Sequence, residues 1–240
     1  MCHAFAPVLQ SNSTIHLNES EQTIHIIYCH GFASSPGSKK ANSFRPYFEA
    51  QGATYSIPDL NQPSFEKLTL TAMIARVIET IEAVDDDETY LIGSSMGGLT
   101  ALHTYDQYRQ HHPDRIKKMV FLAPAFDFLA NRRQQMGADW MEKWREQGDW
   151  AFFNYATNDE RRVHFGLVED IQQYDSASVT VDVPVLIYHG RHDDTVDYQQ
   201  SVDFADQRAS TDVHLLDSDH QLLDQTAHIR TGILQFFDLA

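Results

Sequence analysis

Residues 91–100, LIGSSMGGLT, decide how this chain is interpreted, because an apolar run suited to a buried strand changes there into small residues. Gly93, Ser95 and Gly97 match the pattern G-x-S-x-G, in which a serine lies on a tight turn between a strand and a helix. Such a turn forces the serine into an unfavourable backbone region and brings strand and helix close together, which favours glycine two positions away. The stretch predicts Ser95 as a nucleophile. The plainer alternative is a Ser/Gly-rich helix start in which Ser94 or Ser95 acts only as a cap.

A serine hydroxyl needs a base to take its proton near neutral pH. His220 is the best placed of the 13 histidines, because VHLLDSDHQLLD (213–224) puts it in a loop between the last apolar run and the last helical pattern. This late position fits the chain order Ser, Asp, His. The alternative for His220 is a solvated loop histidine with no chemical role.

The third member of such a triad is an acid that holds the imidazole in its productive tautomer. VLIYHGRHDDTVDY (185–198) ends an apolar run at Gly190 and then offers Asp193 and Asp194. In folds of this kind the acid usually follows that glycine by three positions, with a valine three further on, so Asp193 and Val196 fit and Asp193 is preferred. Asp127 is a weaker candidate, and an acidic helix-capping loop is the alternative without function.

The oxyanion that forms on a carbonyl under attack needs preorganised N–H donors. IIYCHGFASSPGSKK (26–40) follows the first core strand, and its His30-Gly31 pair lets the backbone turn inward. We therefore predict the backbone amides of Phe32 and Met96 as the two donors, the second lying at a helix N-terminus. The same loop does not match the phosphate-binding P-loop pattern.

Short apolar runs alternate with segments of helical period, which predicts an α/β fold with a mostly parallel central sheet flanked by helices. The predicted strands are Thr23–Cys29, Thr54–Ile57, Thr89–Ile92, Lys118–Leu122, Val183–His189 and Val213–Leu216. The predicted helices are Ser38–Gln51, Phe65–Val84, Gly97–Gln110, Tyr198–Gln207 and Thr226–Phe237.

The alternation breaks once, between Pro124 and Pro184. We expect one domain over 1–240 with a lid or cap insertion over 125–182, which contains a short helix followed by two extended runs around an Asn158-Asp159 turn. Aromatic residues of this insertion are candidates for the substrate pocket, although aromatic residues at such spacing more often pack a lid onto its body. The candidates are Trp140, Trp144 and Phe153, with Trp150, Phe152 and Tyr155.

The composition excludes several classes of protein. A formal charge of −16 over 240 residues, without a long basic stripe, argues against binding to nucleic acid or to anionic membranes. No segment has about 20 consecutive apolar residues. Two cysteines, Cys2 and Cys29, and a start without a basic leader favour the cytoplasm. We expect no metal and no cofactor, since HGRHDD lacks the helical two-histidine spacing of metal sites.

Three stretches, YCHGFASSPGSKKAN, LIGSSMGG and HGRHDDTV, resemble the α/β-hydrolase superfamily, and the resemblance extends over nearly the whole chain. They look like the small bacterial esterases of the YqiA-like group. The resemblance implies an eight-stranded sheet, with Thr14–Leu17 as one of its first strands, and the hydrolysis of carboxylic esters or thioesters. The Trp-rich insertion departs from the shortest members of the group.

These observations predict a serine hydrolase that cleaves carboxylic or thioesters of small to medium acyl groups through an acyl-enzyme on Ser95, with a small-molecule ester as its partner. The same fold and triad also serve peptidases, amidases and enzymes that cleave carbon–carbon bonds. A non-catalytic ligand-binding protein is the alternative of another class. The sequence does not fix the oligomeric state.

Overall fold

A computed structural model describes Met1 and residues 23–240 of the protein. Its centre is a six-stranded sheet with the strand order β2-β1-β3-β4-β7-β8, in which all neighbouring strands are parallel. The arrangement confirms the expected α/β class. The strands are β1 (Ile24–Cys29), β2 (Thr54–Ser56), β3 (Glu88–Ser94), β4 (Ile116–Leu122), β7 (Val185–Gly190) and β8 (Thr211–Leu216).

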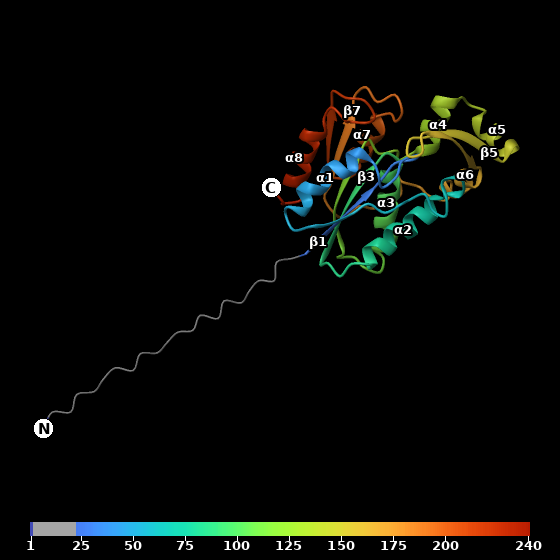
Figure 1. The fold of residues 1–240 in the computed structure, drawn as a ribbon. Coiled ribbons are helices and arrows are strands. Elements are labelled where there is room, and N and C mark those ends of the chain that lie inside the picture. Colours follow the sequence, from blue (N-terminus) through green and yellow to red (C-terminus); the bar gives the residue numbers. More distant parts are fainter. Residues whose placement is uncertain (2–22) are drawn as a thin grey trace.

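Helices cover both faces of this sheet, as Figure 1 shows. They are α1 (Lys39–Glu49), α2 (Leu70–Glu82), α3 (Met96–Tyr108), α7 (Gln199–Asp206) and α8 (Thr226–Phe236). Apolar side chains of α2, α3 and α7 pack into one hydrophobic cluster, whereas those of α1 and α8 pack into a second cluster. Because helices cover the inner strands on both faces, the sequences of these strands are nearly continuous apolar runs, as is usual for parallel strands.

The parallel register brings the carboxyl ends of the strands to one edge. Cys29 of β1 lies opposite Gly93 of β3, and Ser94 lies opposite Leu122 of β4. The loops after β1, β3, β7 and β8 therefore meet at this edge, which is where parallel sheets place their ligands.

The predicted helix Phe65–Val84 is wrong in its first part. A single 3₁₀ turn, η1 (Phe65–Lys67), is followed by Leu68 in an extended conformation, and α2 begins only at Leu70. The Thr69 hydroxyl accepts a hydrogen bond from the amide of Ala72 and so caps α2. Leu68 is buried in this extended conformation, so its side chain remains in the core although the helix does not include it.

The segment between β4 and β7 contains α4 (Phe128–Met136), α5 (Trp140–Gln147), β5 (Asp149–Asn154), β6 (Asp159–His164) and α6 (Gly166–Ile171). β5 and β6 form a separate antiparallel hairpin, as the two predicted extended runs required. The sequence did not predict α4 and α6. Figure 1 shows α4, α5, β5 and α6 grouped beside one end of the sheet.

The described part of the central sheet has six strands, and the additional strand expected at Thr14–Leu17 lies outside the described residues. Of the helices in the described part of the chain, none has both the length and the apolar character that crossing a membrane requires.

Candidate active site

Ser95 lies on the turn between β3 and α3 with φ 54° and ψ −121°, a conformation that L-residues rarely adopt. Its backbone is held on both sides. The Ser95 amide donates to the carbonyl oxygen of Leu122 at 2.9 Å, and the Ser95 carbonyl accepts from Gly98 at 2.9 Å and from Ala125 at 3.1 Å. Strain of this kind persists only where the surroundings fix it, and it is a feature of functional sites.

Two glycines make the close approach at this turn possible. A Cβ atom on Gly97 would lie 2.0 Å from the carbonyl oxygen of Cys29, and a Cβ on Gly93 would lie 2.5 Å from the carbonyl oxygen of Gly97. Both clashes are with backbone, which cannot move aside. The packing of α3 against β1 and β3 therefore requires glycine at the two positions that the sequence pattern indicated.

The structure brings the three predicted triad side chains together. His220, in the loop after β8, has its Nε2 3.1 Å from the Ser95 Oγ and its Nδ1 2.7 Å from the Asp193 Oδ2. In the tautomer with the proton on Nδ1, His220 donates to Asp193 and accepts from the Ser95 hydroxyl. The Asp193 side chain is fully buried, whereas that of His220 is 20% exposed and faces a cavity.

Asp193 is saturated with hydrogen bonds. Its Oδ1 accepts from the amides of Thr195 and Val196, both at 2.8 Å, and its Oδ2 accepts from two imidazoles, those of His220 and His189. Burial alone raises the pKa of this carboxyl, but the hydrogen bonds from His189, His220 and Val196 outweigh it and hold the pKa well below its usual range. The group is therefore a permanent anion behind His220 at neutral pH.

The two alternative acids have other contacts. Asp194 is exposed, and its Oδ1 accepts from the Thr195 hydroxyl at 3.1 Å. The Asp127 side chain accepts from the amide of Ala130 at 2.9 Å and caps α4. Neither carboxylate forms a hydrogen bond with His220, whose partners among residues 23–240 are Ser95 and Asp193.

His189 is a residue of this site that the sequence analysis missed. Its fully buried ring has Nε2 3.0 Å from Asp193 Oδ2 and 3.2 Å from the Val196 carbonyl oxygen, while its Nδ1 lies 2.7 Å from the Ser201 Oγ. Because both neighbours of Nε2 are acceptors, Nε2 carries the proton and Nδ1 accepts from the Ser201 hydroxyl. The available signal was a histidine near the end of an otherwise apolar buried strand, since such a polar group needs partners.

The loop after β1 lies against the nucleophile. A Cβ on Gly31 would be 3.2 Å from the Ser95 Cβ, and among residues 23–240 the amides of Phe32 and Met96 have no hydrogen-bond acceptor. The buried His30 donates from Nδ1 to the Gly31 carbonyl oxygen at 3.0 Å, and its Nε2 accepts from the Leu60 amide at 3.1 Å. Since the C=O and N–H of one peptide point in opposite directions, fixing the Gly31 carbonyl also fixes the Phe32 N–H.

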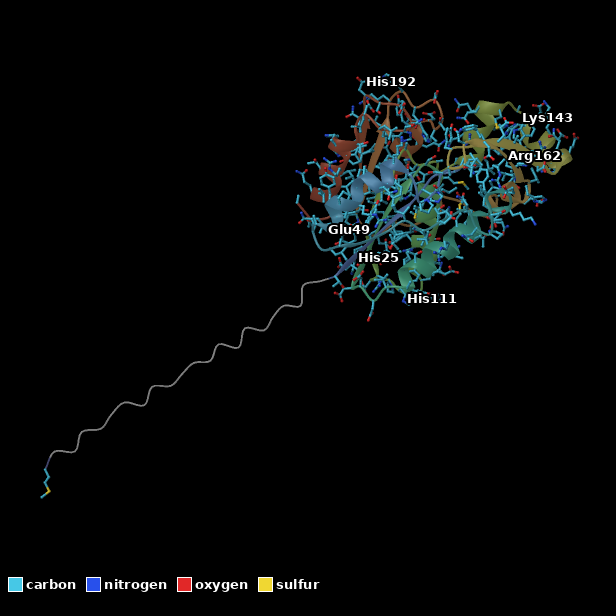
Figure 2. All side chains as sticks on the ribbon, in the orientation of Figure 1. His25, Glu49, His111, Lys143, Arg162 and His192 are labelled. Carbon is cyan, nitrogen blue, oxygen red and sulfur yellow. The ribbon has the colours of Figure 1, made fainter. Side chains whose placement is uncertain are left out.

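Ser95 and His220 open into a cavity of about 960 Å³. Its wall includes His30, Gly31 and Phe32 from the loop after β1, and Phe152, Phe153 and Tyr155 from β5 and the turn after it. In Figure 2, His192, which also lines the cavity, lies at the top of the molecule, whereas His25 and His111 lie at the opposite end of the sheet. In the described ranges, no three His, Cys, Asp or Glu side chains gather as metal ligands would.

Trp140 and Trp144 do not line this cavity, contrary to the sequence prediction. Their side chains are 1% and 0% exposed, and the Trp144 Nε1 donates to the Val163 carbonyl oxygen at 2.8 Å. The two indoles pack against each other and, through Trp144, against Phe152 and Phe165. They form the interior of the segment between β4 and β7. Trp150 also packs against the core, while Phe153 is 46% exposed at the cavity wall.

The model of the uncharacterised protein family UPF0227 matches residues 25–238. The chain belongs to the UPF0227 family. This family match confirms the resemblance to the YqiA-like group, and the sheet and helices have the arrangement of the α/β-hydrolase fold. A curated relative, the mitochondrial palmitoyl-protein thioesterase ABHD10 of Homo sapiens, is 24% identical over 211 residues, which are 83% of this chain and 68% of that protein.

Solved structures show the same fold. A protein of Agrobacterium vitis S4, classed only provisionally as a hydrolase, is 20% identical with a TM-score of 0.78, covering 88% of this chain and 86% of that one. ABHD10 from mouse is 20% identical with a TM-score of 0.73, covering 89% of each chain. Est1E from Butyrivibrio proteoclasticus is 20% identical with a TM-score of 0.73, covering 92% of this chain and 88% of that one.

Proposed function

We propose that this UPF0227 protein is a serine hydrolase of carboxylic esters or thioesters, and that Ser95, His220 and Asp193 are its catalytic triad. The observation that carries the proposal is the continuous hydrogen-bonded series from Ser95 through His220 to the buried anionic Asp193. The series begins at the strained turn of Ser95, beside the amides of Phe32 and Met96, which have no acceptor among residues 23–240. The names of the relatives, a thioesterase and an esterase, support this class of substrate.

In the first half of the reaction, the Ser95 oxygen bonds to the ester carbonyl carbon while its proton passes to His220 Nε2. Asp193 stabilises the resulting imidazolium, and the amides of Phe32 and Met96 donate to the oxyanion. When the tetrahedral intermediate collapses, the bond from carbon to the leaving oxygen or sulfur breaks. The leaving group takes the proton from His220, and the acyl group stays on Ser95.

In the second half, a water molecule attacks the acyl-enzyme. It gives its proton to His220 as it bonds to the carbonyl carbon, and the Ser95 oxygen leaves and takes that proton back. The acid product is released and the enzyme returns to its starting state. The proton transfers use Ser95 and His220, which already lie within hydrogen-bonding distance of each other, as His220 and Asp193 do.

The segment over 125–182 is the proposed lid of this enzyme. Side chains from α4, β5 and the turn after β5 form one wall of the cavity, which adjoins the loop after β1 through the hydrogen bond from the Tyr155 amide to the Ala33 carbonyl oxygen at 3.0 Å. A cavity of about 960 Å³ is large enough for a small to medium acyl ester, since ligand pockets usually measure about 300 to 1,000 Å³. Of the pocket candidates named from the sequence, Phe152, Phe153 and Tyr155 line the cavity, and Phe153 and Tyr155 are exposed and available for substrate contact.

The test is covalent labelling by a fluorophosphonate probe, together with rates on p-nitrophenyl acetate and butyrate and on aminoacyl amides. We expect the native protein to be labelled and Ser95→Ala to be neither labelled nor active. His220→Ala should keep its fold and lose nearly all turnover. Faster hydrolysis of the amides would favour a peptidase or amidase, and a native protein that resists labelling would favour a ligand-binding protein.

A further inference from the structure

The charges around the candidate active-site cavity differ from those of the molecule as a whole. The chain carries a formal charge of −16, yet the cavity is lined by three basic residues (Lys39, Lys40 and Arg132) and two carboxylates (Asp194 and Asp219). When the buried anion Asp193 behind His220 is included, these formal charges balance, so the cavity lacks the acidic excess of the molecule as a whole and does not repel an anionic ligand as the rest of the surface does.

Arg132, on α4, is held in a fixed position within this wall. One of its terminal nitrogens donates to the Gln135 Oε1 at 2.9 Å, and the Gln135 Nε2 donates to the carbonyl oxygens of Asp194 at 3.4 Å and Thr195 at 3.1 Å. Its guanidinium carbon lies 5.4, 5.2 and 5.8 Å from the ring centres of Phe32, Phe128 and Phe152. The guanidinium is thus preorganised by one hydrogen bond and three aromatic rings.

Within residues 23–240, no carboxylate lies within 4.0 Å of the Arg132 guanidinium. Burial lowers the pKa of Arg132, and only the phenol of Tyr155 acts in the opposite direction. Removing a cation from water without a counter-ion is unfavourable, and aromatic contacts return only part of the loss. An anion bound in the cavity could therefore pair with the partly buried guanidinium of Arg132.

Other arginines show what a purely structural arrangement looks like in this chain. Arg162, on the neighbouring hairpin, pairs with Asp149 at 2.6 Å. Arg208 donates to the backbone carbonyl oxygens of Ser176, Ala177, Val179 and Phe204. Arg132 differs from both, because a single side-chain amide is its acceptor and because it faces the cavity that contains Ser95.

We propose that Arg132 binds a carboxylate carried by the substrate, so that the preferred substrates are esters of anionic character. The planar guanidinium matches a carboxylate with two parallel N–H···O bonds. Phe32 connects this contact to the chemistry, because its ring lies beside the guanidinium and its amide is a candidate oxyanion donor. The inference rests on the proposed ester hydrolysis, and it adds the class of ester.

The experiment compares three chromogenic esters on the full chain. p-Nitrophenyl hexanoate is neutral, the p-nitrophenyl monoester of adipic acid carries a carboxylate at the end of an acyl chain of the same length, and the hexanoate ester of 5-hydroxy-2-nitrobenzoate carries it on the leaving group. We expect kcat/KM of the native protein to favour at least one anionic ester. In Arg132→Met the ratio of kcat/KM for that anionic ester to kcat/KM for the neutral ester should fall by about 10- to 100-fold.

Arg145→Met is the matched control, because Arg145 also stacks on an aromatic ring, 5.1 Å from the ring centre of Phe165, but does not line the cavity. It should leave all three rates unchanged. Arg132→Lys keeps the charge without the planar fork and should retain part of the preference. Circular dichroism and the Tm of Arg132→Met, compared with those of the native protein, show whether the variant is folded.

A binding measurement separates this inference from the proposed function. Calorimetry with monomethyl adipate should show binding to Ser95→Ala and at least tenfold weaker binding to Ser95→Ala/Arg132→Met. Binding lost with Arg132 in a protein that hydrolyses no ester would uphold the anion site and overturn the esterase. Normal hydrolysis of the neutral ester with no dependence of either anionic ester on Arg132 would overturn the anion site alone.

Discussion

Asp193 accepts N–H groups at both of its oxygens, two from imidazoles at Oδ2 and two from backbone amides at Oδ1. In Asp193→Asn the new NH₂ group faces N–H donors in either orientation of the amide, because imidazoles donate at one oxygen position and backbone amides donate at the other. We expect kcat to fall on the order of 10³- to 10⁴-fold, because His220 loses its productive tautomer. Asp194→Asn, which alters an exposed carboxylate, should stay within a few-fold of the native rate. Steady-state rates on p-nitrophenyl butyrate give the ranking, and the reverse order would move the acid to Asp194.

His189 is fully buried, contacts Asp193 and does not line the cavity, so we expect it to act as a positioning residue. His189→Phe removes the N–H donor to Asp193, so we expect kcat to fall about tenfold with KM unchanged, and the free energy of unfolding to fall by about 1 to 3 kcal/mol. His189→Gln keeps an N–H donor and should restore part of kcat. Ser201→Ala leaves the bond to Asp193 intact, so it should lower stability alone. Equal kcat in all three variants would show that His189 is only structural.

At the scale of single residues, the sequence predicted that Ser95, His220 and Asp193 lie together, but it did not predict the surrounding contacts of His189 and Arg132. Ser95, His220 and Asp193 could be chosen because chain order and the places where strands end restrict where such residues lie. Their catalytic roles stay predictions. The contacts of His189 and Arg132 depend on distances across the fold, between residues that have no fixed spacing in the sequence.

At the scale of elements, hydrophobic pattern predicted the strands of the main sheet to within a few residues and erred where capping decides. The apolar pattern of Phe65–Val84 is continuous, but Thr69 caps α2 at its N-terminus, so the helix begins only at Leu70. Trp140 and Trp144 mark a short helix in the sequence, and only the packing of the hairpin against that helix shows that both face inward. Periodicity locates an apolar face without saying what covers it.

The proposed lid, residues 125–182, contains a pair of aromatic residues with opposite environments. Trp144→Ala removes a fully buried indole and its hydrogen bond to Val163, so we expect the free energy of unfolding to fall by about 3 to 5 kcal/mol. Phe153→Ala removes a ring that is 46% exposed at the cavity wall, and it should leave stability nearly unchanged while altering kcat/KM between acetate and hexanoate esters. Guanidinium titrations and the two rates test both halves. Loss of stability in Phe153→Ala would place its ring in the packing instead.

For the molecule as a whole, acid has two opposing effects on folding. A formal charge of −16 at pH 7 means that protonating surface carboxylates relieves repulsion within the folded chain. Carboxylates with lowered pKa values act in the opposite sense, because the unfolded chain binds their protons first. Asp193 belongs to the second group, and its pKa is held low by His189, His220 and the Val196 amide against the effect of burial.

The pH dependence of a variant isolates the contribution of Asp193 from the changing net charge. Its folded pKa lies below the unfolded value of about 3.9, so its stabilisation is fully present above that pH and is lost as the pH falls through the folded pKa. The protonated carboxyl of Asp193 and the side-chain amide of the Asp193→Asn variant are both neutral. The difference in unfolding free energy between the native protein and Asp193→Asn should therefore be constant from pH 7 to 5 and narrow below pH 4. Urea titrations at each pH measure it, with Asp194→Asn as the control whose difference stays small throughout. A difference that does not change down to pH 3 would mean that the Asp193 carboxylate is not held by the hydrogen bonds from His189, His220 and the Val196 amide.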